Sequence, residues 1–196
     1  MKENLLISKS DFDGVRQVSR HCSFDNLTPY IRERQFLDLS ELLGESFYYN
    51  VVTNDCDGTY DDLLDGSEYT DCLDNTRFHY GIKRALIHFA YAAYVMESGY
   101  VSTPHGMVQK LNQDSVPVPI AELRNLHDRN RRIGQDYMSG VLDYVCHNTD
   151  TYTLFTKQCD CSCGDKEKRT TRNTSFKFIR GTSSATDSDI RCCPNE

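Results

Sequence analysis

Long apolar runs are what this sequence most plainly lacks. No stretch of its 196 residues approaches the roughly 18 consecutive apolar residues that a membrane-spanning helix needs. The first residues, MKENLLISKSDF, contain no apolar run of about seven or more, which a secretory signal requires. The sequence therefore predicts neither membrane insertion nor export, and reduced thiols are the expected state of its nine cysteines.

Familiar catalytic motifs are also absent. The sequence has no G-x-x-x-x-G-K-[ST], G-x-G-x-x-G, G-x-S-x-G or H-E-x-x-H pattern. His79 and His88 are not spaced to place two metal ligands on one helical face, and His88 is expected to be an interior histidine with a hydrogen-bond partner. A cysteine hydrolase would need a base positioned beside its nucleophile, and no such arrangement is recognisable. We therefore expect no enzymatic activity and no cofactor.

Apolar and basic residues are both scarce. Hydrophobic residues make up 38% of the chain, so part of it is expected to lie on a surface or to become buried only against a partner. The net charge is −7, and residues 157–196 carry eight basic and six acidic residues, against 14 and 23 in the rest of the chain. Such an acidic body argues against tight nucleic-acid binding, because neutralising phosphates requires a basic face.

The spacing of apolar residues predicts a mainly α fold built on a bundle of about four helices. In the first helix, Leu27, Tyr30, Ile31 and Leu37 are expected on one apolar face, and Gly44 is a weak point in the second. The third helix carries two apolar stripes, which predicts a central, buried position. The expected helices span residues 23–39, 40–52, 76–98 and 119–148, with one or two further helical turns within residues 11–17.

The segments between these helices are expected to be irregular. Residues 53–76 are acidic and turn-rich, and favour a loop with one helical turn near Tyr60–Leu64. Residues 99–119 favour an extended loop or an irregular hairpin. Short strands are expected at Thr151–Thr156 and at 175–181. We therefore divide the chain into a helical body, 1–150, and an extended, cysteine-containing C-terminal arm, 151–196, which has too few apolar residues to form its own core.

The acidic loop TNDCDGTYDDLL was compared with a calcium-binding EF-hand loop. With Gly58 at position six, the first and last ligand positions fall on Thr53 and Leu64. The last position should be a bidentate Glu, so both ends are wrong for calcium. A solvated turn is the favoured interpretation, and weak calcium capture is the alternative.

The C-terminal arm contains the cysteine-rich stretch KQCDCSCGDKEKR. In an extended chain, Cys159, Cys161 and Cys163 point to the same side, and Cys192 and Cys193 are the other candidate metal ligands if the arm folds back. C-x-C-x-C is a weak zinc signature, because structural zinc sites usually have C-x₂₋₄-C spacing. Three states stay open: a bound metal, disulfides formed in the released particle, and unligated thiols in a packed arm.

Three segments together resemble a known family. They are LTPYIRERQFLDLSELLGESFYYNVV, TRFHYGIKRALIHFAYAAYVMESGYVSTPHGMVQKLNQDSVPV and the long helix that follows. In order and spacing, and in the run SGYVSTPHGMVQK, residues 5–155 resemble the head–tail connector proteins (neck ring or adaptor proteins) of tailed bacteriophages of the crAss-like type.

The resemblance implies a structural virion protein with no catalytic residues. It implies a helical adaptor that assembles in the host cytoplasm into a ring, typically of twelve copies, between the portal protein and further neck and tail proteins. DNA would pass through the ring without specific binding, and an acidic lining would help it slide. No membrane is involved.

Subunit contacts are expected from the two segments that cannot pack on their own. In the 99–119 segment a Pro/Gly-rich extended chain offers backbone groups, and Met offers an adaptable contact. The basic run KEKRTTR (166–172) is expected to be solvated or to dock on an acidic neighbour. The rival hypothesis is a small zinc-binding regulatory module that uses the C-terminal cysteines and is a monomer or dimer. The expected contact residues are Thr103, Pro104, Gly106, Met107, Lys110, Phe176 and Phe178.

Overall fold

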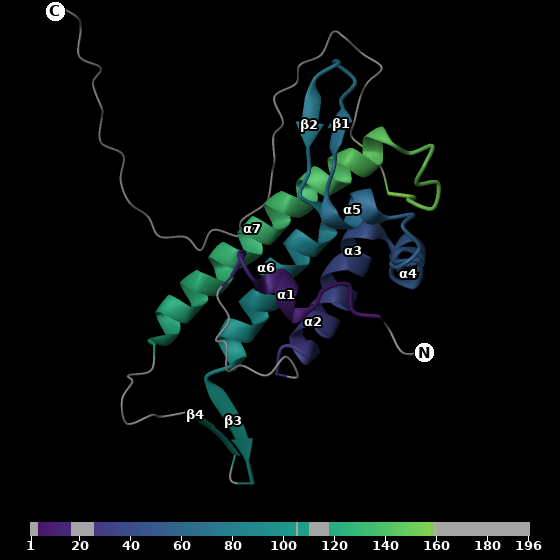
Figure 1. Cartoon of the computed structure of the whole chain (residues 1–196). Coiled ribbons are helices and arrows are strands. Elements are labelled where there is room, and N and C mark those ends of the chain that lie inside the picture. The colour runs from purple at the N-terminus through teal and green to yellow at the C-terminus, as the bar shows by residue number, and fades with distance from the viewer. Residues whose placement is uncertain (1–3, 17–25, 105, 110–117, 158, 160–196) are drawn as a thin grey trace, which may run out of the picture. The chain divides into compact units, whose positions relative to one another are not determined.

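The structure, a computed structural model, describes residues 4–16, 26–104, 106–109, 118–157 and 159. It confirms the predicted mainly α class, with only short β segments (Figure 1). The helical elements are α1 (Lys9–Phe12), α2 (Thr28–Arg34), the π-helical segment η2 (Gln35–Leu39), α3 (Ser40–Leu43), α4 (Glu45–Thr53), α5 (Asp61–Asp65), α6 (Gly81–Glu97) and α7 (Ile120–His147). Two antiparallel hairpins pair β1 (Glu68–Thr70) with β2 (Thr76–Phe78), and β3 (Tyr100–Thr103) with β4 (Gly106–Gln109).

Helix α6 lies at the centre of the body, as its two apolar stripes predict. α7 packs along it, and α2 and α5 also pack against it. Ile82, Leu86 and Phe89 of α6 are fully buried. α7 begins directly after Pro119, as predicted, because the fixed φ of proline suits the start of a helix. The α6–α7 pair is the frame on which the shorter elements pack.

The predicted first helix is interrupted where a π-helical segment follows α2. Ile31 is buried as expected, but Leu37 is 47% exposed, contrary to prediction. A π turn has i→i+5 hydrogen bonds, so it rotates the following residues away from the α-helical phase. Gln35 is buried in this segment, where its Oε1 accepts the Leu6 N–H at 2.9 Å and its Nε2 donates to the Asn4 carbonyl at 2.7 Å.

The predicted second helix is broken rather than weakened at Gly44. This glycine has φ +86°, a conformation that other residues rarely adopt, and it separates α3 from α4. Phe47, Tyr48 and Val51 of α4 point into the core. The expected helix start near residue 23 lies outside the described residues, and α2 begins at Thr28.

The acidic stretch 53–76 is more ordered than predicted. The expected helical turn is present as α5, but the chain then forms the β1–β2 hairpin, in which Tyr69 pairs with Arg77. Because Thr76–Phe78 belongs to β2, α6 begins at Gly81 and not at Thr76 as predicted. The hairpin extends beside the C-terminal half of α7 (Figure 1).

Asp71 organises the turn of this hairpin. Its carboxylate accepts the backbone N–H groups of Asn75 and Leu73, both at 2.9 Å, and its Oδ2 lies 2.9 Å from Nε of Arg77. The Asn75 hydrogen bond, with support from Arg77 and Leu73, holds the pKa of Asp71 well below its usual range. The acidic residues of the turn therefore include one with a structural role that the loop prediction missed.

The strand predicted at Thr151–Thr156 is not formed. The Tyr152 N–H donates to the Asn148 carbonyl, and the Phe155 N–H to the Tyr152 carbonyl, which makes tight turns instead. Tyr152 is 4% exposed. Its ring stacks on Tyr60 with the ring centroids 6.1 Å apart and lies 5.8 Å from the ring of Phe47, so Tyr152 belongs to the core of the body. The buried aromatic rings tie this segment to the body, so we describe it with the body. The first compact unit runs to residue 163, and the second, 164–196, lies outside the described residues.

Candidate functional site

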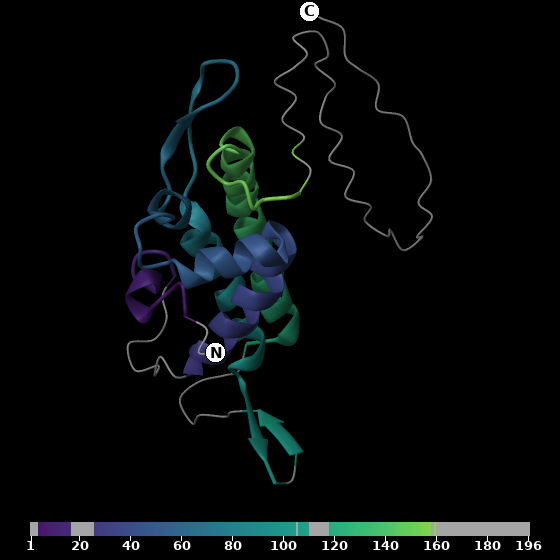
Figure 2. The same cartoon turned by 90° about the vertical axis from the view of Figure 1, so that its right-hand side faces the viewer.

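The β3–β4 hairpin holds the contact residues predicted at 99–119 that the structure describes. It extends from the C-terminal end of α6, clear of the helices (Figure 2). Thr103 Oγ1 donates to the Gly106 carbonyl at 2.8 Å and closes the turn, and Pro104 is exposed at the tip. Gly106 has φ +116°, which only glycine adopts readily. Met107 lies in β4, and the other three expected contacts, Lys110, Phe176 and Phe178, lie outside the described residues.

This hairpin exposes apolar side chains at one end of the molecule. Val108 is 45% exposed, and Val118 and Ile120, at the nearby start of α7, are 49% and 51% exposed. A two-stranded hairpin is only marginally stable alone in water. The exposed apolar residues are therefore suited to packing against another surface.

The cysteines do not form a metal site within the described residues. Cys146, in the last turn of α7, forms a disulfide with Cys159. This pairing corrects the expectation of reduced thiols for these two residues and removes Cys159 from the proposed ligand set. The remaining candidate ligands, Cys161, Cys163, Cys192 and Cys193, lie outside the described residues.

The acidic loop also lacks a metal-binding cluster. In the described part of the chain, no group of three or more His, Cys, Asp or Glu residues could hold a metal ion, and this includes Asp55, Asp57 and Asp61. Cys56 and Cys72 of the same acidic stretch are exposed free thiols.

Two surfaces of opposite charge lie on different sides of the body. Residues 41–76 contain ten Asp or Glu and no Lys, Arg or His. The N-terminal half of α7 carries Arg124, Arg129 and Arg132, which are exposed and have no ion pair among the described residues. Figure 2 shows α4 toward the viewer and the N-terminal half of α7 behind the other helices. We call these the acidic surface (41–76) and the arginine row (Arg124, Arg129, Arg132).

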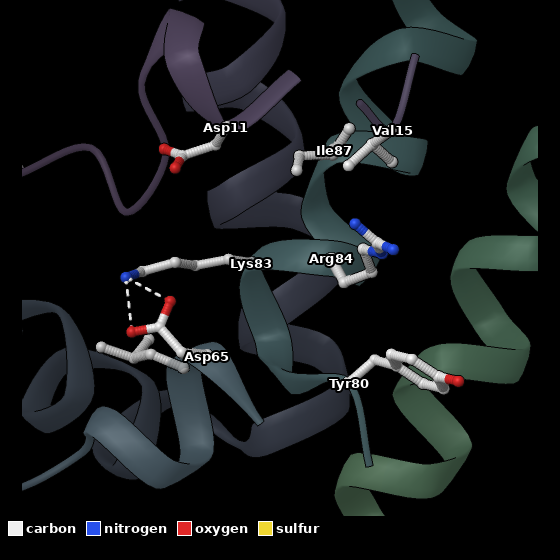
Figure 3. Close-up of a pocket in the computed structure, with 8 residues that line it drawn as sticks. Asp11, Val15, Asp65, Tyr80, Lys83, Arg84 and Ile87 are labelled. Carbon is white, nitrogen blue, oxygen red and sulfur yellow. Dashed lines mark hydrogen bonds and ion pairs between the residues drawn. The ribbon is translucent and has the colours of Figure 1, made fainter. Parts of the chain in front are cut away.

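A cleft of about 290 Å³ lies between α1, α5 and α6 (Figure 3). Its apolar walls are Val15, Leu64 and Ile87. Its two basic residues, Lys83 and Arg84, are adjacent on α6. Lys83 points toward Asp65, and its Nζ lies 2.7 Å and 3.0 Å from the two carboxylate oxygens, whereas Arg84 points to the other side. Lys83 is therefore paired with a carboxylate, and Arg84 is not.

Arg84 is the unpaired cation of this cleft within the described residues. Its Nε is buried and has no hydrogen-bond partner, and no hydrogen bond or ion pair of its guanidinium group is present there. The Arg84 Cζ lies 6.0 Å from the centroid of the Tyr80 ring, so a cation–π contact compensates only in part. Arg34 also has a buried, unpartnered Nε, but its terminal nitrogen binds Glu33 at 2.6 Å.

A polar cluster lies behind the cleft, where α6 meets α7. Asn130 is fully buried, and its Oδ1 accepts the Arg16 Nε–H at 2.8 Å and lies 3.3 Å from His88 Nδ1. His88 therefore has the hydrogen-bond partner that we predicted. The pKa of His88 is lowered to about 4, chiefly by burial, with a further contribution from the positive charges of Arg16 and Arg84 and against the opposing effect of the Asn130 hydrogen bond.

The analysis of the sequence missed both Arg84 and Asn130. Asn130 carries a detectable signal, because it is a polar residue in the apolar seam of α7 that includes Leu126, Ile133 and Tyr137. Arg84 carries no comparable signal, since an unpaired arginine is recognised only when its surroundings are known.

Comparisons with known proteins give one family. None of the described helices is long and apolar enough to cross a membrane. No curated protein and no solved structure matches the chain. Residues 39–165, about two thirds of the chain and including α4, the β1–β2 hairpin, α6 and α7, match a family of unknown function. The chain therefore belongs to the protein family DUF6712.

Proposed function

We propose that this protein is a structural virion component that assembles into a ring and serves as an adaptor between the portal and the tail of a phage particle. The ring would act as a conduit for the genome and would have no enzymatic activity. Its place between portal and tail, and its expected twelve copies, rest on the resemblance to connector proteins. Its capacity for self-association is supported by the surface of the chain.

The observation that carries the proposal is the separation of the acidic surface from the arginine row. The segment of the acidic surface contains ten carboxylates and no basic residue; Asp65 and Asp71 are paired with Lys83 and Arg77, which leaves eight without an ion pair among the described residues. The arginine row exposes three guanidinium groups with no ion pair there. Because the two lie on different sides of the body (Figure 2), one copy can present its arginine row to the acidic surface of the next. Complementary potentials of this kind set orientation and suppress wrong contacts.

Such a contact joins two different surfaces, so it is heterologous. Repeated heterologous contacts close into a ring when the rotation between copies allows closure. A two-fold dimer would instead bring like-charged surfaces together at its axis, which costs free energy. The charge distribution therefore favours a ring over an isologous dimer.

The β3–β4 hairpin supports a second kind of contact. It extends from one end of the body, and Val108, Val118 and Ile120 are exposed at this end. We assign this end to contacts with a neighbouring component of the neck. The predicted contact residues Thr103, Pro104 and Gly106 form its tip.

Charge reversal tests the proposed contact. One variant carries Arg124→Glu, Arg129→Glu and Arg132→Glu, and a second carries Glu41→Lys, Glu45→Lys and Asp57→Lys. All six positions are exposed, so both variants are expected to keep the helical circular dichroism of the wild type. Sedimentation velocity at low ionic strength should show large assemblies for the wild type and weaker assembly for each variant alone, because the first reverses the charge of the arginine row and the second changes the net charge of residues 41–76 from −10 to −4.

Two results would contradict the proposal in different ways. If the wild type stays monomeric at high protein concentration and low salt, the proposed self-association is wrong. If the wild type assembles and each variant alone assembles equally well, the proposed contact between the acidic surface and the arginine row is wrong. High salt serves as a further control, since it screens exposed charges and should weaken assembly.

A further inference from the structure

Arg84 is an unusual residue for an exposed cleft, since its charge lacks the partners that such a group normally has. Buried polar atoms in folded proteins are almost always hydrogen-bonded, and an exception calls for an explanation such as an absent ion. The Arg84 Nε is buried without a partner, and no ion pair forms on this side chain within the described residues. The Tyr80 ring, at 6.0 Å, offers a weak contact and no hydrogen-bond acceptor to the guanidinium plane.

The two carboxylates of the cleft are already engaged elsewhere. Asp65 binds Lys83 at 2.7 Å and 3.0 Å. Asp11 accepts hydrogen bonds from the backbone N–H of Ser8 at 2.6 Å and from its hydroxyl at 2.8 Å, which caps α1. Figure 3 shows both carboxylates apart from the Arg84 guanidinium group. Neither therefore neutralises Arg84.

The surroundings of Arg84 also favour negative charge. Arg16 donates to the buried Asn130 at 2.8 Å, and Asn130 lies 3.3 Å from His88, which is buried and whose lowered pKa leaves it uncharged at neutral pH. The described residues that line the cleft thus include Arg84 as an unpaired cation, and both of their carboxylates are bound to other groups. A cavity of about 290 Å³ is small for an organic ligand of drug size and ample for a carboxylate or phosphate group.

We propose that the cleft between α1, α5 and α6 is a binding site for a small oxyanion, a carboxylate or phosphate group, held by Arg84. The planar guanidinium group matches the geometry of both oxyanions and can bind them through two parallel hydrogen bonds. Val15 and Ile87 exclude water from one side of the site, which strengthens the charged contact. The inference does not depend on self-association, because every residue involved comes from one copy.

Isothermal titration calorimetry of the full chain tests this site with two probes. Sodium phosphate and sodium succinate are titrated at an ionic strength held constant with sodium chloride. We expect saturable binding of at least one probe to the wild type, and the comparison of the two shows whether phosphate or carboxylate is preferred. Arg84→Gln should bind roughly tenfold or more weakly, as expected for the loss of a charge-assisted hydrogen bond.

Arg32→Gln is the matched control, because it removes an exposed arginine from α2 that does not line the cleft. It should bind like the wild type. Should Arg84→Gln lose the helical circular dichroism, Arg84→Lys takes its place, since it keeps a charge and loses the planar two-point contact. Absence of saturable binding to the wild type, or equal affinity of the wild type and the Arg84 variant, would overturn the proposal.

Discussion

Gly134 of α7 lies against the Phe89 ring of α6 with no room for a side chain. A Cβ at this position would lie 2.6 Å from Phe89 Cε1 and 3.2 Å from the Ala85 carbonyl oxygen. We expect Gly134→Ala to lower the free energy of unfolding by about 1–3 kcal/mol, because overpacking a well-filled core outweighs the better helix propensity of alanine. Chemical denaturation followed by circular dichroism measures the change.

Gly140 of the same helix provides the matched control. A Cβ there would meet only the Cβ of His79, at an ordinary distance of 3.8 Å. Gly140→Ala should therefore raise the free energy of unfolding by up to about 1 kcal/mol through helix propensity. If both substitutions changed stability in the same direction, the close α6–α7 packing described here would be wrong.

The titration of His88 makes the stability of the fold depend on pH. Because burial lowers its pKa to about 4 in the folded chain, the unfolded chain, with a pKa near its ordinary value of about 6.5, takes up a proton first as the pH falls. Its contribution to stability is therefore complete above about pH 6.5 and is lost progressively between about pH 6.5 and 4, by up to about 1.4 kcal/mol per pH unit. His88→Gln should show a flatter dependence of unfolding free energy on pH over this interval.

His127→Gln serves as the comparison, because His127 lies on the outer part of α7 and bonds Asp128 at 2.8 Å. It should keep the pH dependence of the wild type. A His88→Gln variant with the same slope as the wild type would contradict the buried, uncharged state of His88.

At the scale of single residues, the sequence predicted types of contact better than positions. The interior, hydrogen-bonded His88 is confirmed, because it lies on a helix with two apolar stripes that is buried at the centre of the body. Leu37 was misplaced, since a π turn is set by tertiary packing around Gln35 and has no local sequence pattern. Arg84 was missed because desolvation of a side chain depends on segments far apart in the sequence.

At the scale of elements, the disulfide between Cys146 and Cys159 fixes the end of α7 to the segment that follows it. It closes a loop with a sequence separation of 13 residues, for which the loss of chain entropy on cross-linking corresponds to about 3 kcal/mol. We expect a reducing agent to lower the melting temperature of the wild type, and Cys146→Ser to have a lower melting temperature than the wild type. Calorimetry with and without reductant measures the shift.

The exposed thiols give the control for this experiment. Cys56→Ser and Cys72→Ser should leave the melting temperature unchanged, since neither cysteine is paired. An unchanged melting temperature on reduction of the wild type would show that the disulfide does not stabilise the body.

Long periodic elements were predicted well, and short ones poorly. The apolar stripes of α6 and the seam of α7 each repeat over several turns, so local sequence determines both helices. The β1–β2 hairpin was missed because its strands have three residues each and depend on the side chain of Asp71 rather than on an apolar pattern. The strand expected at Thr151–Thr156 does not form, because the burial of Tyr152 in the core outweighs the local β preference of the segment.

At the scale of the whole molecule, the body should fold without the second unit. The core residues of the described chain lie between Leu6 and Tyr152, and the disulfide ends at Cys159. Deleting residues 164–196 is therefore expected to keep the helical circular dichroism and the unfolding transition of the body, while it impairs assembly. A truncated chain that unfolds would show that residues 164–196 are part of the core. A truncated chain that assembles normally would show that these residues are dispensable for assembly.

Electron-microscopic imaging of the assembled wild-type protein tests the central claim most directly. We expect closed rings in which the N-terminal half of α7 of each copy faces the acidic surface around α4 of the next, with the β3–β4 hairpins directed away from the plane of the ring. Particles with two-fold symmetry, or rings whose copies meet through other surfaces, would contradict the account.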